Sequence, residues 1–297
     1  MRWKRNTGFD QIEDRRGQSS GSGGFGGMFG GGGGGIPIPM GKAGGGIGGL
    51  VVVVILFLLF SGVLGGGGGL SGLGGLGGGA VEPGGTLDPQ GDTDQQLAYI
   101  VSDIQDFWAE TFSQAGKQYP YTKLVLFSGA TQSSCGPASA ATGPFYCPAD
   151  QKVYLDLGFM DELTRRFGAR EGDFAMAYVV AHEFGHHLQT VLGVSEAVQR
   201  TAQDDPSRRN DLSVRQELQA DCLAGVWAHA AQSDLEPGDI DEALSAASAV
   251  GDDRIQEATS GRIDPESWTH GSAEQRTAWF TNGYRSGKTN DCDTFAQ

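Results

Sequence analysis

Basic residues are scarce beyond the first 45 positions of this chain. Of its 297 residues, 21 are Lys or Arg and 36 are Asp or Glu, which gives a net charge of −15. Residues 1–45 hold six of the basic residues and three of the acids, so the remainder carries 15 basic and 33 acidic residues. Because a phosphate backbone attracts Lys and Arg and repels carboxylates, we expect no nucleic-acid partner.

Cysteine is also rare, and no Cys-x-x-Cys spacing occurs. The four cysteines are Cys135, Cys147, Cys222 and Cys292. This spacing disfavours a four-cysteine zinc site. An even number of cysteines suggests disulfides in an oxidising compartment. Cys135–Cys147 would close a short Gly/Pro-rich loop, and Cys222–Cys292 would tie a helix to the C-terminal tail. The sequence alone leaves all three connectivities open, and free buried thiols are the alternative.

Large side chains are few in the first 85 residues, which contain 33 of the 50 glycines. Glycine has no side chain to pack and costs the most entropy to order, so this segment cannot bury a core. We predict a disordered cytoplasmic tail over residues 1–46 and a flexible Gly-rich linker over residues 65–92. Residues 93–297 remain, and they suffice for one packed domain.

One apolar run interrupts the glycines. Residues 47–64 read IGGLVVVVILFLLFSGVL and carry no charge. A helix of that length spans about 27 Å, close to the hydrocarbon thickness of a bilayer. We predict one transmembrane anchor, with a cleaved signal or a buried helix as alternatives. The nearby Lys and Arg all precede the run. By the positive-inside rule, this indicates a single-pass protein of a bacterial cell membrane, with its N-terminus cytoplasmic and its C-terminal domain outside.

Hydrophobic periodicity predicts a mainly helical α+β domain with a small sheet. The expected strands cover Tyr121–Gly129 and Lys152–Phe159. The expected helices are one from Thr93, a short one over Asp161–Phe167, a long one over Asp173–Leu192, one over Val214–Ala231 and one from about Ser272. Gly193 ends the long helix, and Ser213/Gln216 and Ser272/Gln275 fit capping boxes at the last two.

The long helix contains the sequence AHEFGHHLQ, in which His182 and His186 are four residues apart. This spacing places both imidazoles on one helix face, where they can hold one zinc ion. Glu183 follows the first histidine and is placed to take a proton from a water at the metal. A polar surface helix is the alternative. The apolar flank AMAYVVAHEF favours a buried helix instead, where unexplained charge is costly.

A catalytic zinc site commonly has three protein ligands. A third histidine six residues after His186 is excluded, because Gln189 and Leu192 stand where that pattern needs Gly and His. The next long helix reads RQELQADCLAGVW and offers Glu217 as the third ligand. Asp221, one turn further on, can accept the free N–H of a zinc-bound histidine. The alternative is a solvated acidic face.

These blocks resemble known zinc peptidases. ELQADC is similar to the Glu-x-x-Ala-Asp stretch of membrane-associated prenyl-protein and heat-shock-type peptidases, in which the Glu is the third ligand. A closer resemblance is to a bacterial family of neutral zinc metallopeptidases. It extends over MRWKR, EDRRGQSSG, GDFAMAYVVAHEFGHHLQ, RQELQADCLAGVWA and WTHGSAEQR. The resemblance implies a zincin-like catalytic domain of the Glu-ligand type.

The block WTHGSAEQR suggests a further site residue. In the prenyl-protein peptidases a similar block supplies a histidine that donates to the developing oxyanion, which assigns that role in this chain to His270. Gly271 departs from the proline of that block. A structural histidine that caps a helix is the alternative.

The sequence thus predicts hydrolysis of peptide bonds by a water activated at one zinc ion per chain. His182, His186 and Glu217 are the predicted ligands, and Glu183, Asp221 and His270 are the predicted catalytic group. The expected partners are a protein or peptide substrate and a membrane. Two alternatives stay open: an envelope scaffold that keeps zinc without turnover, and a hydrolase of a non-peptide amide.

Overall fold

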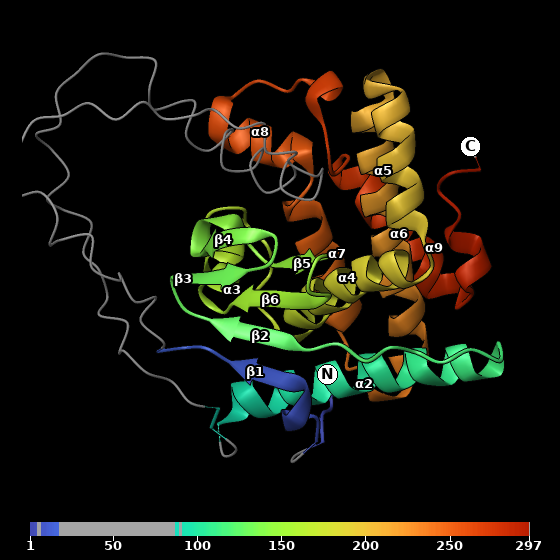
Figure 1. Ribbon diagram of the computed structural model, residues 1–297. Helices are drawn as coiled ribbons and strands as arrows, with labels where there is room; N and C mark the ends of the chain where they lie inside the picture. The colour runs from blue at the N-terminus through green and yellow to red at the C-terminus, as the bar shows by residue number, and fades with distance from the viewer. Residues whose placement is uncertain (5–6, 18–86, 89–90, 297) are drawn as a thin grey trace, which may run out of the picture.

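The computed structural model describes residues 1–4, 7–17, 87–88 and 91–296 (Figure 1). It contains a four-stranded sheet with the strand order β1-β2-β6-β5. The strands are β1 (Ile12–Asp14), β2 (Leu124–Phe127), β5 (Phe145–Cys147) and β6 (Lys152–Asp156). β1, β2 and β6 are parallel, and β5 runs antiparallel to β6 at the edge. A separate hairpin pairs β3 (Ala130–Ser133) with β4 (Gly136–Ser139).

Helices make up most of the remaining domain. They are α2 (Asp92–Gln114), α3 (Gly158–Arg165), α4 (Asp173–Val191), α5 (Val194–Asp204), α6 (Arg209–Ala230), α7 (Asp239–Ala249), α8 (Asp252–Ser260) and α9 (Ala273–Ser286). The central helix α4 contacts both α6 and the strands β5 and β6. Its apolar residues Phe174, Ala177 and Phe184 are fully buried. The predicted class, a mainly helical α+β fold with a small sheet, is confirmed.

Two helix boundaries follow the local sequence. α4 ends at Val191, and Gly193 takes the left-handed conformation with φ 78° that stops it. Ser272 and Gln275 form the expected capping box at the start of α9. The capping box at Ser213 is wrong, because the helix begins four residues earlier, at Arg209. There the chain passes directly from a 3-10 turn that starts at Pro206 into α6.

Helices α6 and α9 touch through their backbones. A Cβ atom on Gly225 of α6 would lie 2.1 Å from the carbonyl oxygen of Phe280, and one on Gly283 of α9 would lie 2.0 Å from that of Cys222. Only glycine permits this approach from both sides. The disulfide Cys222–Cys292 ties α6 to the chain beyond α9, and Cys135–Cys147 joins the β3–β4 hairpin to β5.

The N-terminal residues belong to this domain, so the prediction of a separate disordered tail over residues 1–46 is wrong for its first part. β1 pairs with β2 in parallel register, Ile12 opposite Leu124 and Asp14 opposite Leu126. The side chains of Met1 and Ile12 are buried in the same core as α2 and α4. The reason is tertiary: a three-residue strand has no periodicity of its own and forms only against a neighbour.

The predicted membrane anchor, residues 47–64, lies outside the described residues, as does the linker up to residue 86. Among the helices that the structure describes, none is both long and apolar enough to cross a bilayer.

Candidate metal centre

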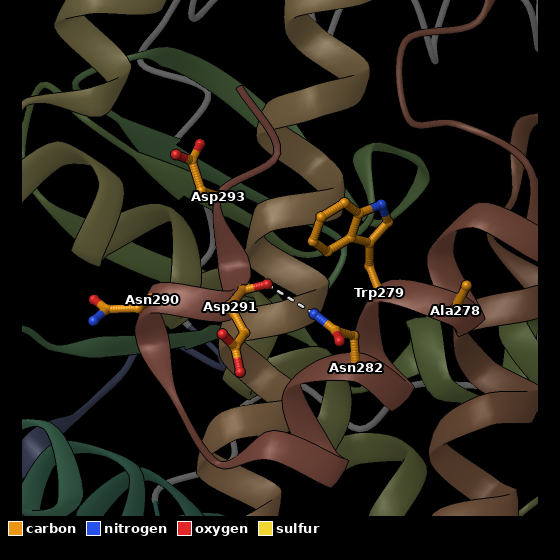
Figure 2. A pocket seen from close by; sticks show the side chains of 6 residues that line it. All are labelled: Ala278, Trp279, Asn282, Asn290, Asp291 and Asp293. Atoms are coloured by element: carbon orange, nitrogen blue, oxygen red, sulfur yellow. Dashed lines mark hydrogen bonds between the residues drawn. The ribbon is translucent and has the colours of Figure 1, made fainter. Parts of the chain in front are cut away.

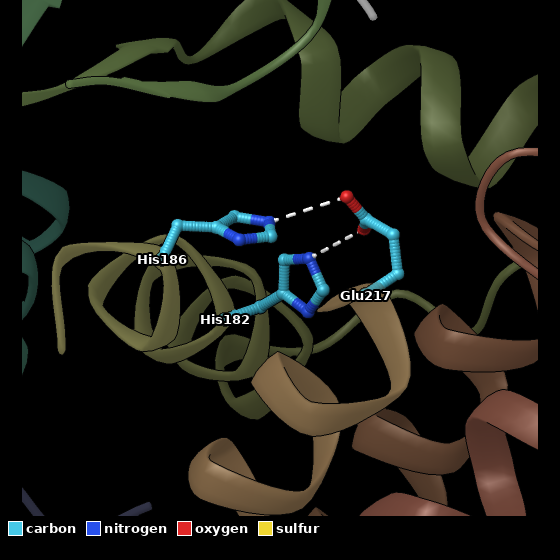
Figure 3. A group of neighbouring side chains, drawn as sticks. All are labelled: His182, His186 and Glu217. Atoms are coloured by element: carbon cyan, nitrogen blue, oxygen red, sulfur yellow. Dashed lines mark hydrogen bonds and ion pairs between the residues drawn. The ribbon is translucent and has the colours of Figure 1, made fainter. Parts of the chain in front are cut away.

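Two of the three histidines of α4 and the glutamate of α6 meet at a single point (Figure 3). One ligand atom each from His182, His186 and Glu217 lie within 4.8 Å of one another. Nε2 of His182 is 3.1 Å from Oε2 of Glu217, and Nε2 of His186 is 3.4 Å from Oε1. The side chains are 8%, 16% and 10% exposed, in that order. The structure thus brings together the three residues that the sequence predicted as zinc ligands.

A glycine between the two histidines permits this meeting. Gly185 faces α6, where a Cβ atom added to it would lie 3.0 Å from Cα of Ala220. That distance is shorter than ordinary van der Waals contact, so a larger residue would push the helices apart. Because Glu217 lies on α6, one turn before Ala220, the close approach of α4 and α6 sets its distance from the histidines.

The donor set fits a zinc ion. Two imidazoles and one carboxylate are a ligand combination that catalytic zinc uses. The other ring nitrogen of each histidine already has a partner: Nδ1 of His182 lies 2.8 Å from Oδ1 of Asp221, and Nδ1 of His186 lies 2.9 Å from Oε1 of Gln189. If each Nδ1–H donates to these oxygens, each Nε2 keeps its lone pair for a metal.

Gln189 was not predicted as part of the site. It is fully buried, and its amide nitrogen donates to the backbone oxygen of Gln216 at 2.7 Å and to Oε1 of Gln219 at 3.1 Å. These two bonds to α6 orient the amide so that its oxygen faces His186. The signal in the sequence was a polar residue three positions after the second histidine, on the helix face that turns toward α6.

The charges of the centre depend on one another. Burial alone would lower the pKa of His182, but the Asp221 and Glu217 carboxylates outweigh it and raise that pKa to about 10. Burial would raise the pKa of Glu217, but His186 and His182 hold it well below its usual range. The imidazoles and the carboxylate thus stabilise each other's charged forms. A divalent cation would take over the role of the proton on the imidazole.

The pKa of Glu183 shifts in the opposite direction from that of Glu217. Burial raises the pKa of its carboxyl group, and His186 and His182 only partly oppose this. Glu183 directly follows His182 on α4, and its carboxyl group is buried. A carboxylate with a raised pKa is a better proton acceptor than an exposed one, as a general base requires.

Behind His182 lies a buried network around Asp221. Its Oδ1 accepts from the hydroxyl of Tyr178 at 2.6 Å, and Arg276 donates to both oxygens, from Nε at 2.8 Å and from Nη2 at 3.0 Å. Asp221 is fully buried and Arg276 is 4% exposed. Arg276 offsets the cost of burying this carboxylate, which stays ionised and available to His182.

His270 is held by an aspartate that sequence reasoning missed. Nδ1 of His270 lies 3.0 Å from Oδ1 of Asp252, the first residue of α8. Oδ2 of Asp252 accepts from the backbone N–H groups of Thr269, His270 and Gly271 at 2.7, 2.7 and 3.1 Å. Burial lowers the pKa of His270, and Asp252 and Glu217 more than reverse this.

The other two histidines have structural contacts. His187 is fully buried between the backbone oxygen of Pro120, 2.8 Å from Nε2, and the hydroxyl of Tyr146, 3.2 Å from Nδ1. His229 donates from Nδ1 to the backbone oxygen of Tyr284 at 2.7 Å.

A pocket of about 450 Å³ lies elsewhere, between the middle of α9 and the turn after it (Figure 2). Its lining residues are Ala278, Trp279, Asn282, Asn290, Asp291 and Asp293. None of the predicted site residues is among them, so this pocket is separate from the metal centre.

Comparison with known proteins gives the family. The profile of the family described as "Putative neutral zinc metallopeptidase" matches residues 1–295. A relative from Escherichia coli (strain K12), named Uncharacterized protein YpfJ, is 40% identical over 300 residues, which cover 100% of this chain and 99% of the relative. Uncharacterized protein Rv2575 of Mycobacterium tuberculosis is 51% identical over 190 residues, which cover 60% of this chain and 64% of the relative.

No solved structure matches the chain. The description of the family implies zinc as the metal and a metallopeptidase as the class of enzyme. With a profile that spans nearly every residue and a relative that is similar over its whole length, the chain belongs to the neutral zinc metallopeptidase family.

Proposed function

We propose that this protein is a membrane-associated peptidase that holds one zinc ion through His182, His186 and Glu217. The observation that carries the proposal is the convergence of these three ligand atoms within 4.8 Å of one another, with Glu183 next to His182 on α4. A structural zinc site needs no adjacent proton acceptor, so the carboxyl group of Glu183 favours catalysis over a scaffold role.

Each residue of the centre has a part in hydrolysis. When bound, zinc supplies a Lewis acid that lowers the pKa of water and polarises a carbonyl group. Glu183 accepts the proton of the attacking water and delivers it to the leaving amine. Asp221 and Gln189 keep Nε2 of the two histidines directed at the centre. His270, held by Asp252, donates a hydrogen bond to the oxygen that becomes negative in the transition state.

The partners follow from this chemistry. The substrate is a protein or peptide, and residues 47–64 bring the enzyme to a bacterial membrane. The two disulfides favour the extracytoplasmic side for the catalytic domain.

Zinc content and peptide cleavage, measured on the same samples of the full chain, test the proposal. The full chain is needed because residues 1–17 contribute to the sheet. We expect one zinc ion per chain in the wild type, and loss of both zinc and cleavage in Glu217→Ala. Glu183→Gln should keep zinc and cleave at least about 100-fold more slowly. Glu162→Ala, on the exposed surface of α3, is the control and should match the wild type.

Other outcomes would favour the alternatives. A wild type that binds zinc but cleaves no peptide, with Glu183→Gln indistinguishable from it, would support an envelope scaffold. Cleavage of a cell-wall amide but of no peptide would support a non-peptide hydrolase. Folded wild-type protein that binds no zinc would refute the proposed centre.

A further inference from the structure

The residues just before and just after positions 18–86 both form hydrogen bonds to one carboxylate, that of Asp94. Arg16, just before this segment, donates to Asp94 from Nη1 to Oδ1 at 2.9 Å and from Nη2 to Oδ2 at 2.8 Å. Asp88, just after it, donates its backbone N–H to the same Oδ2 at 2.8 Å. Asp94 lies in the first turn of α2 and is 6% exposed. The residues that flank the segment therefore lie side by side.

The residues before the segment are built into the domain at several independent points. The N–H of Arg15 donates to the carbonyl oxygen of Leu126 at 2.7 Å, which extends the pairing of β1 with β2. Gly8 has a left-handed φ of 76°, and a Cβ atom there would lie 2.1 Å from the carbonyl oxygen of Ala98 on α2. The amino group of Met1 lies 3.0 Å from Asp173 at the start of α4.

Undocking these N-terminal residues would be costly. It would expose the buried side chains of Met1 and Ile12 and leave β2 as an unpaired sheet edge. It would also leave the carboxylate of Asp94 without its arginine in a largely buried position, and breaking such a pair is strongly destabilising. The docked form is thus the folded form of the domain.

Three of the six basic residues that suggested a cytoplasmic N-terminus have partners in this fold. Arg15 pairs with Glu13 at 2.7 Å, Arg16 pairs with Asp14 and Asp94, and the side chain of Arg2 donates to the backbone oxygen of Ser233. These contacts account for the three arginines without a membrane. For these three arginines, positive charge before the apolar run is explained by the fold and does not by itself indicate a cytoplasmic N-terminus.

We infer that residues 1–17 and residues 87–296 lie on the same side of any membrane that this chain meets. A strand cannot pair with its neighbour through a bilayer, so one crossing between residues 17 and 87 is incompatible with this fold. With the catalytic domain outside, as proposed above, the N-terminus would lie outside as well, in contrast to the cytoplasmic N-terminus expected from the charge pattern.

The inference does not depend on the proposed enzymatic activity, and cysteine labelling tests it. All four native cysteines are in the two disulfides, so an introduced cysteine is the only free thiol. Asp10→Cys places a reporter on the N-terminal segment, and Gln203→Cys places one on α5; both positions are exposed. Each full-length variant is expressed in a bacterial host, and spheroplasts are treated with a membrane-impermeant maleimide before and after permeabilisation with detergent.

We expect the same labelled fraction at both positions before permeabilisation, and full labelling of both afterwards. Labelling of one position with protection of the other would overturn the inference, because it would place the two on opposite sides. Lys4→Cys is a second exposed reporter on the N-terminal segment, for use if Asp10→Cys does not accumulate. Protease resistance of each variant in detergent shows that the domain is folded.

Discussion

His182 and Asp221 form the closest link between the metal centre and the buried network behind it, with 2.8 Å between Nδ1 and Oδ1. Arg276 holds the same carboxylate from the other side, 2.8 Å from Oδ2. The orientation of a proposed zinc ligand on α4 thus depends on an aspartate of α6 and an arginine of α9.

Replacing Asp221 with Asn should lower both the affinity for zinc and the stability of the fold. We expect zinc affinity to fall about 10- to 100-fold, because Asn is a weaker acceptor for the imidazole N–H. Loss of the carboxylate also leaves Arg276 without its counter-charge, which should cost about 3–5 kcal/mol of unfolding free energy. Competition with a chelator measures the first effect and urea unfolding the second. Asp211→Asn, on the exposed start of α6, is the control. Unchanged zinc affinity would contradict the proposed role of Asp221.

Gln189 should affect zinc affinity through its hydrogen bond to His186. In Gln189→Leu the Nδ1 group of His186 loses its acceptor at 2.9 Å, and we expect about a 10-fold loss of zinc affinity. The matched control is Gln203→Leu on the exposed face of α5. If Gln189→Leu lowers only thermal stability and leaves zinc affinity as in the wild type, the residue holds the helices together and does not position the ligand.

Gly185→Ala tests the spacing of the two helices. Alanine raises helix propensity by about 1 kcal/mol, but its methyl group would lie 3.0 Å from Cα of Ala220, an atom of the backbone that cannot turn aside. Overpacking of this kind costs about 1–3 kcal/mol, so we expect lower stability together with weaker zinc binding. Calorimetry and zinc titration measure the two effects. A more stable variant with normal zinc affinity would show that the contact between α4 and α6 is not tight.

The pH dependence of cleavage should depend on Asp252. Burial lowers the pKa of His270 and Asp252 more than reverses this, so the imidazole stays protonated above its ordinary value of 6.5. If the protonated ring stabilises the oxyanion, kcat/KM falls only as pH rises through this raised pKa. Asp252→Asn removes the main raising charge, while Glu217 and Arg276 keep facing the ring with opposite effects. We therefore expect kcat/KM of Asp252→Asn to fall at a lower pH than kcat/KM of the wild type.

The pH profile separates this role from a structural one. If Asp252 only shaped the loop of Thr269–Gly271, its replacement would lower kcat/KM by the same factor at every pH. A His270→Gln variant should have no such alkaline limb, and a limb that persists there would assign the titration to another group.

The two disulfides should differ in their contribution to stability. Cys222–Cys292 joins residues 70 positions apart, and Cys135–Cys147 joins residues 12 apart. From loop-closure entropy, we expect Cys222–Cys292 to contribute about 4 kcal/mol to the free energy of unfolding, and Cys135–Cys147 about 3 kcal/mol. Urea unfolding of the two double alanine variants should therefore show the larger loss without Cys222–Cys292. An equal or reversed order would indicate that residual structure in the unfolded chain, and not loop length, sets the difference.

Several features of the site could be predicted from the sequence because they depend on short distances along one helix. His182, Glu183 and His186 lie within two turns, and helical geometry alone places the two histidines on one face. Glu217 and Asp221 were found because two acids four residues apart on an apolar helix need partners. The capping box of Ser272 and Gln275 is likewise local.

The tertiary structure alone decided which distant residues complete the site and where the N-terminus lies. Gln189 and Asp252 have ordinary sequence surroundings, and their roles arise from the packing of α4 on α6 and of α8 against the loop before α9. β1 has only three residues, so no pattern distinguishes it from a tail, and it exists because β2 offers a free edge. Local rules determine which side chains share a helix face, whereas contacts between distant segments depend on the free energy of the whole packed domain.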